Sequence, residues 1–168
     1  PDIKLTNFNI EVKMPISQSG QFVVKNDSNE FEFSNSNKAE LNDETKYIIN
    51  YLNINVSNSI SSNSTILDIP IDIKEKWLIN YYKKNNVKFF MTEYNKELIL
   101  FELDKISKVF DITVNIRTKK SGSSKLPKKY IEDVEYVIDS KILLENKNYV
   151  SYGNFEDNFK LDFGDYTV

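Results

Sequence analysis

The stretch that decides the fold runs from Val87 to Arg117 and reads VKFFMTEYNKELILFELDKISKVFDITVNIR. It holds three apolar segments, Val87–Glu93, Glu97–Leu103 and Ile106–Arg117, which short polar breaks separate. In the third segment apolar residues occupy every second position from 110 to 116, so one side of that strand is expected to be buried and the other wetted. The pattern predicts an antiparallel meander over about residues 87–117 as the centre of the fold.

Further strands are predicted on both sides of this meander, because short runs of β-forming residues alternate with polar residues or end at proline. They cover Phe8–Met14, Gln21–Lys25, Glu30–Phe33 and Ile66–Ile69, followed in the tail by Tyr149–Tyr152, Phe159–Phe163 and Tyr166–Val168. The segment Tyr130–Leu144 fits a helix and a strand about equally, so both alternatives stay open.

Two helices are predicted from apolar residues that recur at helical spacing. The first covers about Ala39–Leu52; the second is capped by Asp72 and carries Ile73, Trp77 and Tyr81 along one side. Together with the strands they indicate an α+β fold, a mainly antiparallel sheet with two or three helices packed on one side. No repeat or linker divides the chain, and its length of 168 residues predicts a single domain over 1–168.

The composition removes most familiar catalytic sites. The chain has no His, no Cys, one Arg and four Gly. Without imidazole or thiol groups it cannot build a Ser-His-Asp or Cys-His nucleophile or a structural zinc site. With so few glycines it has no phosphate-binding glycine loop. On these grounds we assign no catalytic, metal-binding or cofactor-binding residue, and we expect no cofactor.

A basic segment follows the predicted meander. Its cations lie close together in the sequence with no acid among them. A phosphate, a nucleic acid or an acidic surface could bind there, without base specificity because a single arginine is available. The alternative is a solvated hairpin tip. The candidate anion-binding residues are Arg117, Lys119, Lys120, Lys125, Lys128 and Lys129.

Acidic and aromatic residues offer two further candidates. Paired carboxylates could hydrolyse glycosides or bind calcium, yet nothing in the sequence brings two of them together, so a solvated surface is favoured. These acids are Asp68, Asp72, Glu156, Asp157, Asp162 and Asp165. The aromatic side chains could line a carbohydrate or peptide groove, but their spacing fits a core at least as well. They are Tyr47, Tyr51, Trp77, Tyr81, Tyr82, Phe89 and Phe90, with Trp77 the expected core anchor.

These observations favour a non-enzymatic structural or protein-interaction domain, such as a virion, cell-surface or secretion-machinery component, with a protein partner or self-assembly through its sheet edges. Two alternatives remain: a non-specific anion- or nucleic-acid-binding module that uses residues 117–129, and a carboxylate-only hydrolase or carbohydrate-binding domain. The net charge of −3 predicts only weak attraction to nucleic acid, and no apolar stretch is long enough to cross a membrane. The abundance of Asn, Lys and Ile is typical of an AT-rich genome.

Overall fold

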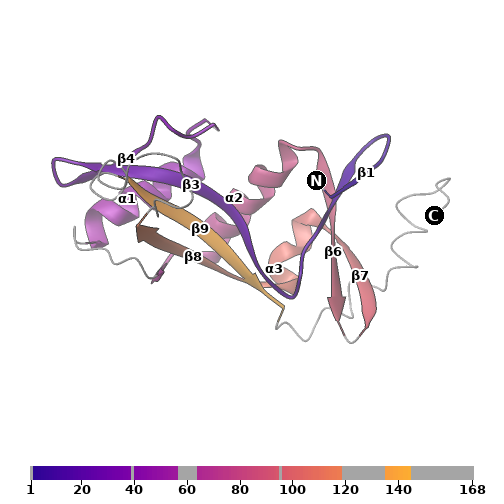
Figure 1. Cartoon of the computed structure of the whole chain (residues 1–168). Coiled ribbons are helices and arrows are strands. Elements are labelled where there is room, and N and C mark those ends of the chain that lie inside the picture. Colours follow the sequence, from indigo (N-terminus) through magenta and orange to yellow (C-terminus); the bar gives the residue numbers. More distant parts are fainter. Residues whose placement is uncertain (1, 39, 57–63, 95, 119–134, 145–168) are drawn as a thin grey trace. The chain divides into compact units, whose positions relative to one another are not determined.

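The structure, a computed structural model, describes residues 2–38, 40–56, 64–94, 96–118 and 135–144 (Figure 1). These residues group into two compact units. Unit 1 takes the described residues of 1–17, 78–112 and 142–168, and unit 2 takes those of 18–77 and 113–141. The single domain predicted over 1–168 is not tested by this division and stays a prediction.

The predicted α+β class is confirmed. In the part of the chain that the structure describes, mainly antiparallel strands form two sheets, and three α-helices pack against them. One detail of the predicted meander differs. Its first two strands lie in one sheet, whereas its third strand lies in the other.

Unit 1 contains a four-stranded sheet with the order β1-β2-β6-β7. Its strands are β1 (Ile3–Lys4), β2 (Asn9–Val12), β6 (Val87–Tyr94) and β7 (Glu97–Glu102). Neighbouring strands are antiparallel except β2 and β6, which are parallel. This parallel pairing places the N-terminal hairpin directly beside the first strand of the predicted meander.

The two sides of this sheet carry separate apolar clusters, because successive side chains of a strand point to opposite sides. One cluster contains Phe8, Ile10, Phe89, Met91 and Leu100. The other contains, among others, Tyr82, Phe90, Ile99, Phe101 and Phe110. A sheet that is apolar on both sides is an unfavourable place for charged groups. Glu11 and Lys13, which follow Ile10 in the chain, are therefore unusual in this sheet because they are charged.

The segment predicted as a strand from Ile106 begins instead as a helix. The 3₁₀ turn η1 (Leu103–Lys105) runs into α3 (Ile106–Val109), and β8 starts only at Asp111. Ile106 and Val109 are both buried in the core of unit 1. Their three-residue spacing puts both on one side of a helical turn, whereas a strand would point them to opposite sides. Burial of both side chains therefore favours the helix.

Unit 2 is built on a five-stranded sheet with the order β4-β3-β9-β8-β5. The strands are β3 (Ile16–Asp27), β4 (Glu30–Phe33), β5 (Thr65–Leu67), β8 (Asp111–Thr118) and β9 (Glu135–Leu143), and most of their residues belong to unit 2. β3 pairs antiparallel with β4, and β5 pairs antiparallel with β8. β3, β4 and β5 confirm the strands predicted at Gln21–Lys25, Glu30–Phe33 and Ile66–Ile69, although β3 begins earlier and β5 ends two residues earlier.

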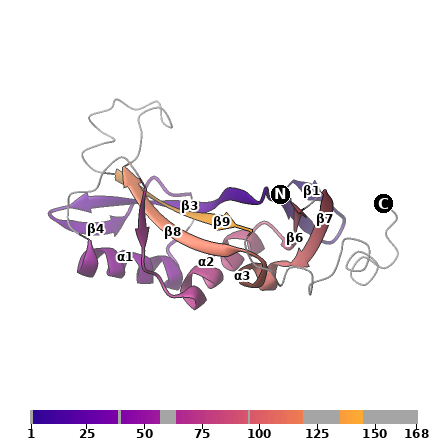
Figure 2. The same ribbon diagram turned by 90° about the horizontal axis from the view of Figure 1, so that it is seen from below.

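Helix α1 (Asp43–Asn55) begins four residues later and ends three residues later than the sequence predicts, and Asn42 caps its start. The side chain of Asn42 accepts from the backbone N–H of Thr45, and the Thr45 hydroxyl accepts from the backbone N–H of Asn42, which forms a capping box. Ile48 and Leu52 are fully buried against the sheet. Figure 2 shows α1 lying along one side of the strands of unit 2.

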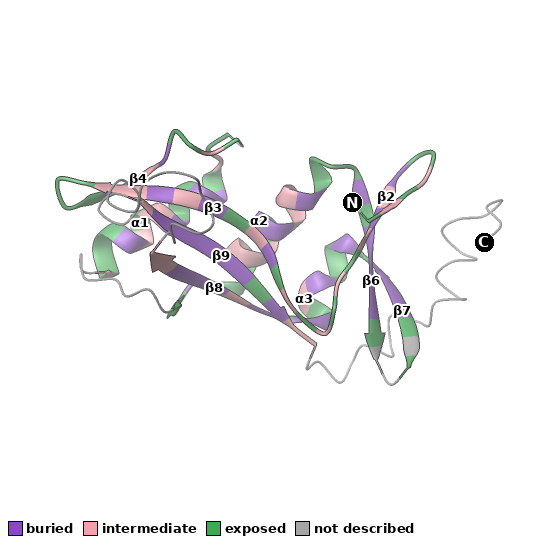
Figure 3. Ribbon diagram, in the orientation of Figure 1, coloured by how far each residue is buried: buried purple, intermediate pink, exposed green. Residues whose placement is uncertain are grey.

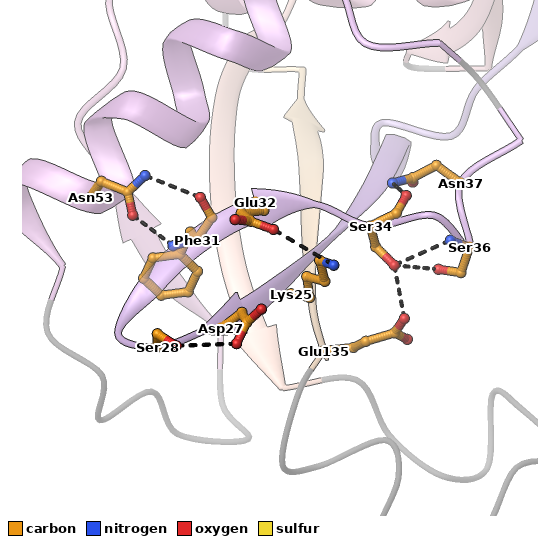
Figure 4. A network of polar contacts seen from close by, with 10 residues as sticks. All are labelled: Lys25, Asp27, Ser28, Phe31, Glu32, Ser34, Ser36, Asn37, Asn53 and Glu135. Atoms are coloured by element: carbon orange, nitrogen blue, oxygen red, sulfur yellow. Dashed lines mark hydrogen bonds and ion pairs between the residues drawn. The ribbon is translucent and has the colours of Figure 1, made fainter.

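The edge strand β4 is closed by a side chain of α1 (Figure 4). The amide of Asn53 accepts a hydrogen bond from the backbone N–H of Phe31 at 2.7 Å and donates one to the Phe31 carbonyl at 3.1 Å. These are the backbone groups that an added strand uses. The contact therefore opposes the predicted role of this edge in self-assembly.

Helix α2 (Ile71–Lys83) begins one residue before the predicted cap. The carbonyl of Pro70 accepts the first helical hydrogen bond, from the backbone N–H of Lys74, so Asp72 lies in the first turn and is not the cap. Its carboxylate there still complements the positive end of the helix dipole. Trp77 is buried in the unit 2 core beside Phe22, at 5.5 Å between ring centroids, which confirms it as an anchor.

The segment predicted as either helix or strand is a strand in its described part, β9, and Figure 3 shows most of it buried. The predicted tail strands at residues 149–152, 159–163 and 166–168 lie outside the described residues. Residues 53–55 continue α1, and residues 57–63 lie outside the described residues.

Candidate active site

The N-terminal hairpin of unit 1 brings two carboxylates to the same side. The antiparallel register pairs Ile3 with Ile10. One residue further along, the same register places Asp2 opposite Glu11, and opposed residues share one side of a hairpin. The backbone N–H of Val12 donates a hydrogen bond to Oδ2 of Asp2 at 2.9 Å, which holds that side chain against β2.

A lysine lies beside the second carboxylate. Glu11 and Lys13 are two residues apart on an extended chain, so their side chains project to the same side. Nζ of Lys13 lies 3.1 Å from Oε1 of Glu11, with 18% of the Lys13 side chain and 12% of the Glu11 side chain exposed. Charges that are so largely withdrawn from solvent are screened less than surface charges.

Tyr82 of α2 completes the surroundings of this lysine. Nζ of Lys13 lies 5.7 Å from the centroid of the Tyr82 ring. Burial lowers the pKa of Lys13, but the Tyr82 phenol and the Glu11 carboxylate outweigh it, each through charge and a hydrogen bond, and raise the pKa above its ordinary value of 10.5. Lys13 is therefore cationic at neutral pH, and it can supply a positive charge or a proton but cannot act as a base.

Strand β6 pairs with the backbone that carries Glu11 and Lys13. Glu11 is opposite Phe90 in the parallel register, and the backbone N–H of Lys13 donates to the carbonyl of Met91 at 2.9 Å. Thr92 lies on the same side of β6 as Phe90, and only 1% of it is exposed. Its hydroxyl has no hydrogen-bond partner among the described residues. The hairpin is thus fixed on a rigid strand, with one further polar group close to it in the sheet.

Two carboxylates and one ammonium group suit a divalent cation bound together with an anionic substrate. Mg²⁺ is usually held by one or two carboxylates together with substrate phosphates and water. Asp2 and Glu11 supply hard oxygen atoms for such an ion. No group of three or more acids that could hold a metal unaided occurs within residues 2–144 as far as they are described. The donor set therefore fits an ion that the substrate helps to hold.

A second arrangement of charges lies in unit 2. Nε of Arg117 lies 3.3 Å from Oδ2 of Asp139, across the neighbouring strands β8 and β9. The Asp139 side chain is 2% exposed and that of Arg117 is 21% exposed. A buried carboxylate needs a partner of this kind, because an unpaired buried charge is costly. Lys141 projects from the same side of β9 as Asp139, by strand alternation, and is exposed.

The residues predicted from the sequence are placed only in part. Arg117 is the one member of the predicted anion-binding set that the structure describes, because Lys119, Lys120, Lys125, Lys128 and Lys129 lie outside the described residues. Among the predicted acids, Asp68 and Asp72 are exposed. The others, Glu156, Asp157, Asp162 and Asp165, lie outside the described residues. Most of the predicted aromatic residues are buried in the cores.

The residues predicted from the sequence do not include Asp2, Glu11, Lys13 or Asp139. The prediction of a strand at Phe8–Met14 already put Glu11 and Lys13 on its polar side. The remaining signal is the spacing itself, in which Asp2 is followed by eight residues and then by Glu-Val-Lys at positions 11–13. It becomes informative only when a tight hairpin is recognised between the two.

The comparisons with known proteins add one finding. No family model matches the chain, and no curated protein matches it. The fold is similar to that of HhaI endonuclease, solved in complex with DNA, with a TM-score of 0.76 and 23% sequence identity. The match covers 93% of this chain and 82% of that chain. At this identity the similarity establishes the fold, and the activity has to be argued from the site.

This finding corrects the expected function. The expectation of a non-enzymatic structural or protein-interaction domain, in a virion, at a cell surface or in a secretion machinery, is contradicted by the similarity of the fold to that of HhaI endonuclease. The expectation equated missing His and Cys with missing catalysis, whereas carboxylates and a lysine can in general hydrolyse esters together with a cation. A protein partner or self-assembly finds no support. No helix among the described residues is long and apolar enough to cross a membrane.

Proposed function

We propose that the chain is a cation-dependent nuclease that hydrolyses phosphodiester bonds of DNA, with Asp2, Glu11 and Lys13 at its active site. One observation carries the proposal: the two carboxylates share one side of a hairpin, and Nζ of Lys13 lies 3.1 Å from Oε1 of Glu11. The similarity of the fold to an endonuclease solved with DNA supports it.

Electrostatics explain why a cation belongs to this proposal. Asp2, Glu11 and Lys13 together carry a net charge of about −1 at neutral pH. Such a site repels a phosphodiester, which is itself an anion. Asp2 and Glu11 would hold a Mg²⁺ ion, which would reverse that sign, polarise the phosphoryl oxygen and lower the pKa of a bound water. The proposal departs here from the sequence prediction that no metal is used, which the structure does not test.

Each side chain then has a defined part. Asp2 and Glu11 supply oxygen ligands and hold the attacking water next to the phosphorus. Lys13 places a positive charge beside the phosphate, where negative charge grows in the transition state. In the reaction an oxygen–phosphorus bond forms to water and one phosphorus–oxygen ester bond breaks. The water gives up a proton, and the departing alkoxide takes one.

Binding of the DNA backbone requires cations beyond this site. The predicted anion-binding lysines, Lys119, Lys120, Lys125, Lys128 and Lys129, remain candidates for phosphate contacts in this proposal. A set of such contacts makes affinity fall steeply with salt. We therefore expect binding of duplex DNA that weakens strongly between about 50 and 200 mM salt.

The test is nicking of supercoiled plasmid by the full chain in Mg²⁺ or Mn²⁺, with EDTA as a blank. Asp2→Asn, Glu11→Gln and Lys13→Met are each expected to reduce the rate by about 100-fold or more. Asp104→Asn and Lys83→Met are the matched controls, because these two residues form an exposed ion pair at 3.7 Å in the same unit. Both controls are expected to nick like the parent chain.

Two results would contradict the proposal. The first is nicking that persists at the parental rate in the Glu11→Gln and Asp2→Asn variants, which would trace the activity to a contaminant or another site. The second is the absence of both nicking and DNA binding in the parent chain at low salt. Circular dichroism of each variant separates loss of activity from loss of fold.

A further inference from the structure

We infer that Arg117 reads a guanine base in duplex DNA and that Asp139 is the positioning residue that aims it. The inference rests on the proposed function, since it assumes that the chain binds DNA. It assigns a sequence preference to a protein whose composition predicted non-specific binding only. The observations that carry it all lie within unit 2.

The first observation is the way in which Arg117 is held. Its Nε donates to Oδ2 of Asp139 at 3.3 Å, and its Nη1 donates to the carbonyl of Thr118 at 3.4 Å. Asp139 is buried on the strand next to β8, so the anchor itself cannot swing into solvent. An arginine held at two points has lost much of its rotamer freedom before any ligand arrives.

The second observation is what remains free on the guanidinium group. Arginine has five N–H donors, and two of them are used in these contacts. The Nη2 pair and the second hydrogen of Nη1 have no acceptor among the described residues, and 21% of the side chain is exposed. One hydrogen of Nη1 and one of Nη2 can form the end-on fork of the guanidinium group. That fork matches the O6 and N7 acceptors of guanine in the major groove.

The third observation separates a base contact from a phosphate contact. The chain has 22 lysines and arginines, of which one is arginine. A lysine serves as a point charge for phosphate, whereas bidentate recognition needs the planar fork. This arginine is held by the buried carboxylate of Asp139. Such an anchor fixes the direction of the fork, which a bidentate contact with a base edge requires.

The experiment measures binding of a randomised duplex library, with sequencing of the bound fraction. The protein is the full chain carrying Glu11→Gln, so that the DNA stays intact. We expect enrichment of a G·C pair at one position by about 5- to 150-fold. Arg117→Lys is expected to remove that preference while the dependence of binding on salt stays the same.

A second variant distinguishes loss of the base contact from loss of the fold. Arg117→Met/Asp139→Leu removes both charges together, so no buried carboxylate is left unpaired. It is expected to fold and to lose the same preference. Lys25→Met is the matched control, because Lys25 forms a 3.6 Å ion pair with Glu32 on the same sheet and is not held by a buried acid. It is expected to keep the preference.

The outcomes are distinct. If the Arg117→Met/Asp139→Leu variant weakens binding of all sequences equally and lowers the salt slope by about one, Arg117 contacts phosphate and the inference is overturned. An unchanged sequence profile in both Arg117 variants overturns it as well. If the Glu11→Gln chain binds no duplex DNA at low salt, the proposed function itself fails, and the inference fails with it.

Discussion

Replacing Lys13 by Met should change metal binding and cleavage in opposite directions. In the folded chain the ammonium group lies 3.1 Å from the Glu11 carboxylate, so it competes with any cation for that oxygen. Its removal frees the carboxylate for a metal ion. The same change takes away the positive charge that the proposed reaction needs beside the phosphate.

The size of the gain follows from the 3.1 Å separation between the Lys13 and Glu11 charges. With the dielectric constant of water, two unit charges at this distance attract by about 1.3 kcal/mol, and with an effective value of about 20 by about 5 kcal/mol. Both side chains are mostly buried, so the smaller figure is a lower bound. Because about 1.4 kcal/mol corresponds to a factor of ten, Lys13→Met should raise the affinity for Mn²⁺ at least about tenfold.

The assay is titration of the DNA-free chain with Mn²⁺, followed by the electron paramagnetic resonance signal of the free ion. Lys83→Met is the control, because it also removes a lysine from an ion pair of unit 1, but an exposed one, and no change in affinity is expected. Unchanged or weaker Mn²⁺ binding by Lys13→Met would refute the reasoning. It would mean that the ion does not bind at Glu11.

Three further predictions concern single contacts. Tyr82→Phe removes a group that raises the pKa of Lys13, so the alkaline limb of the cleavage profile should shift to lower pH; a profile that stays in place up to pH ~10 would count against this role. Asn53→Ala leaves the backbone groups of Phe31 without partners, which should cost about 1–3 kcal/mol in the free energy of unfolding and promote self-association, seen by urea denaturation and sedimentation. Arg117→Met should destabilise the chain by about 3–5 kcal/mol, and adding Asp139→Leu should recover most of that loss in the same denaturation assay.

Local patterns predicted most of the secondary structure, because strands and helices leave a period in the sequence. Residues 8–14 alternate, and a strand lies within them. The start of α1 depends instead on a cap. The residues of the Asn42–Thr45 capping box were visible in the sequence, but the predicted start of the helix did not take them into account. The turn from Ile106 to Val109 was misassigned, because four apolar-rich residues fit either period until their burial is known.

The candidate site was out of reach for a different reason. It depends on pairings between segments that are far apart in the chain, such as the parallel register of Glu11 with Phe90. Tyr82 approaches Lys13 only because α2 packs on that sheet. No local period encodes either contact. The same is true of Arg117 and Asp139, which are 22 residues apart and meet across two strands.

Composition was the weakest guide to function, and the reason is physical. Histidine is valuable where a proton must move near neutral pH, so its absence does exclude several kinds of nucleophile. Phosphodiester hydrolysis makes another demand, which is to bring an anion and a water molecule together and to stabilise growing negative charge. Carboxylates that hold a cation, with a lysine beside them, meet that demand. Such groups can act together only if they share one side of a rigid element. The pairing of β1, β2 and β6 places Asp2, Glu11 and Lys13 in this way.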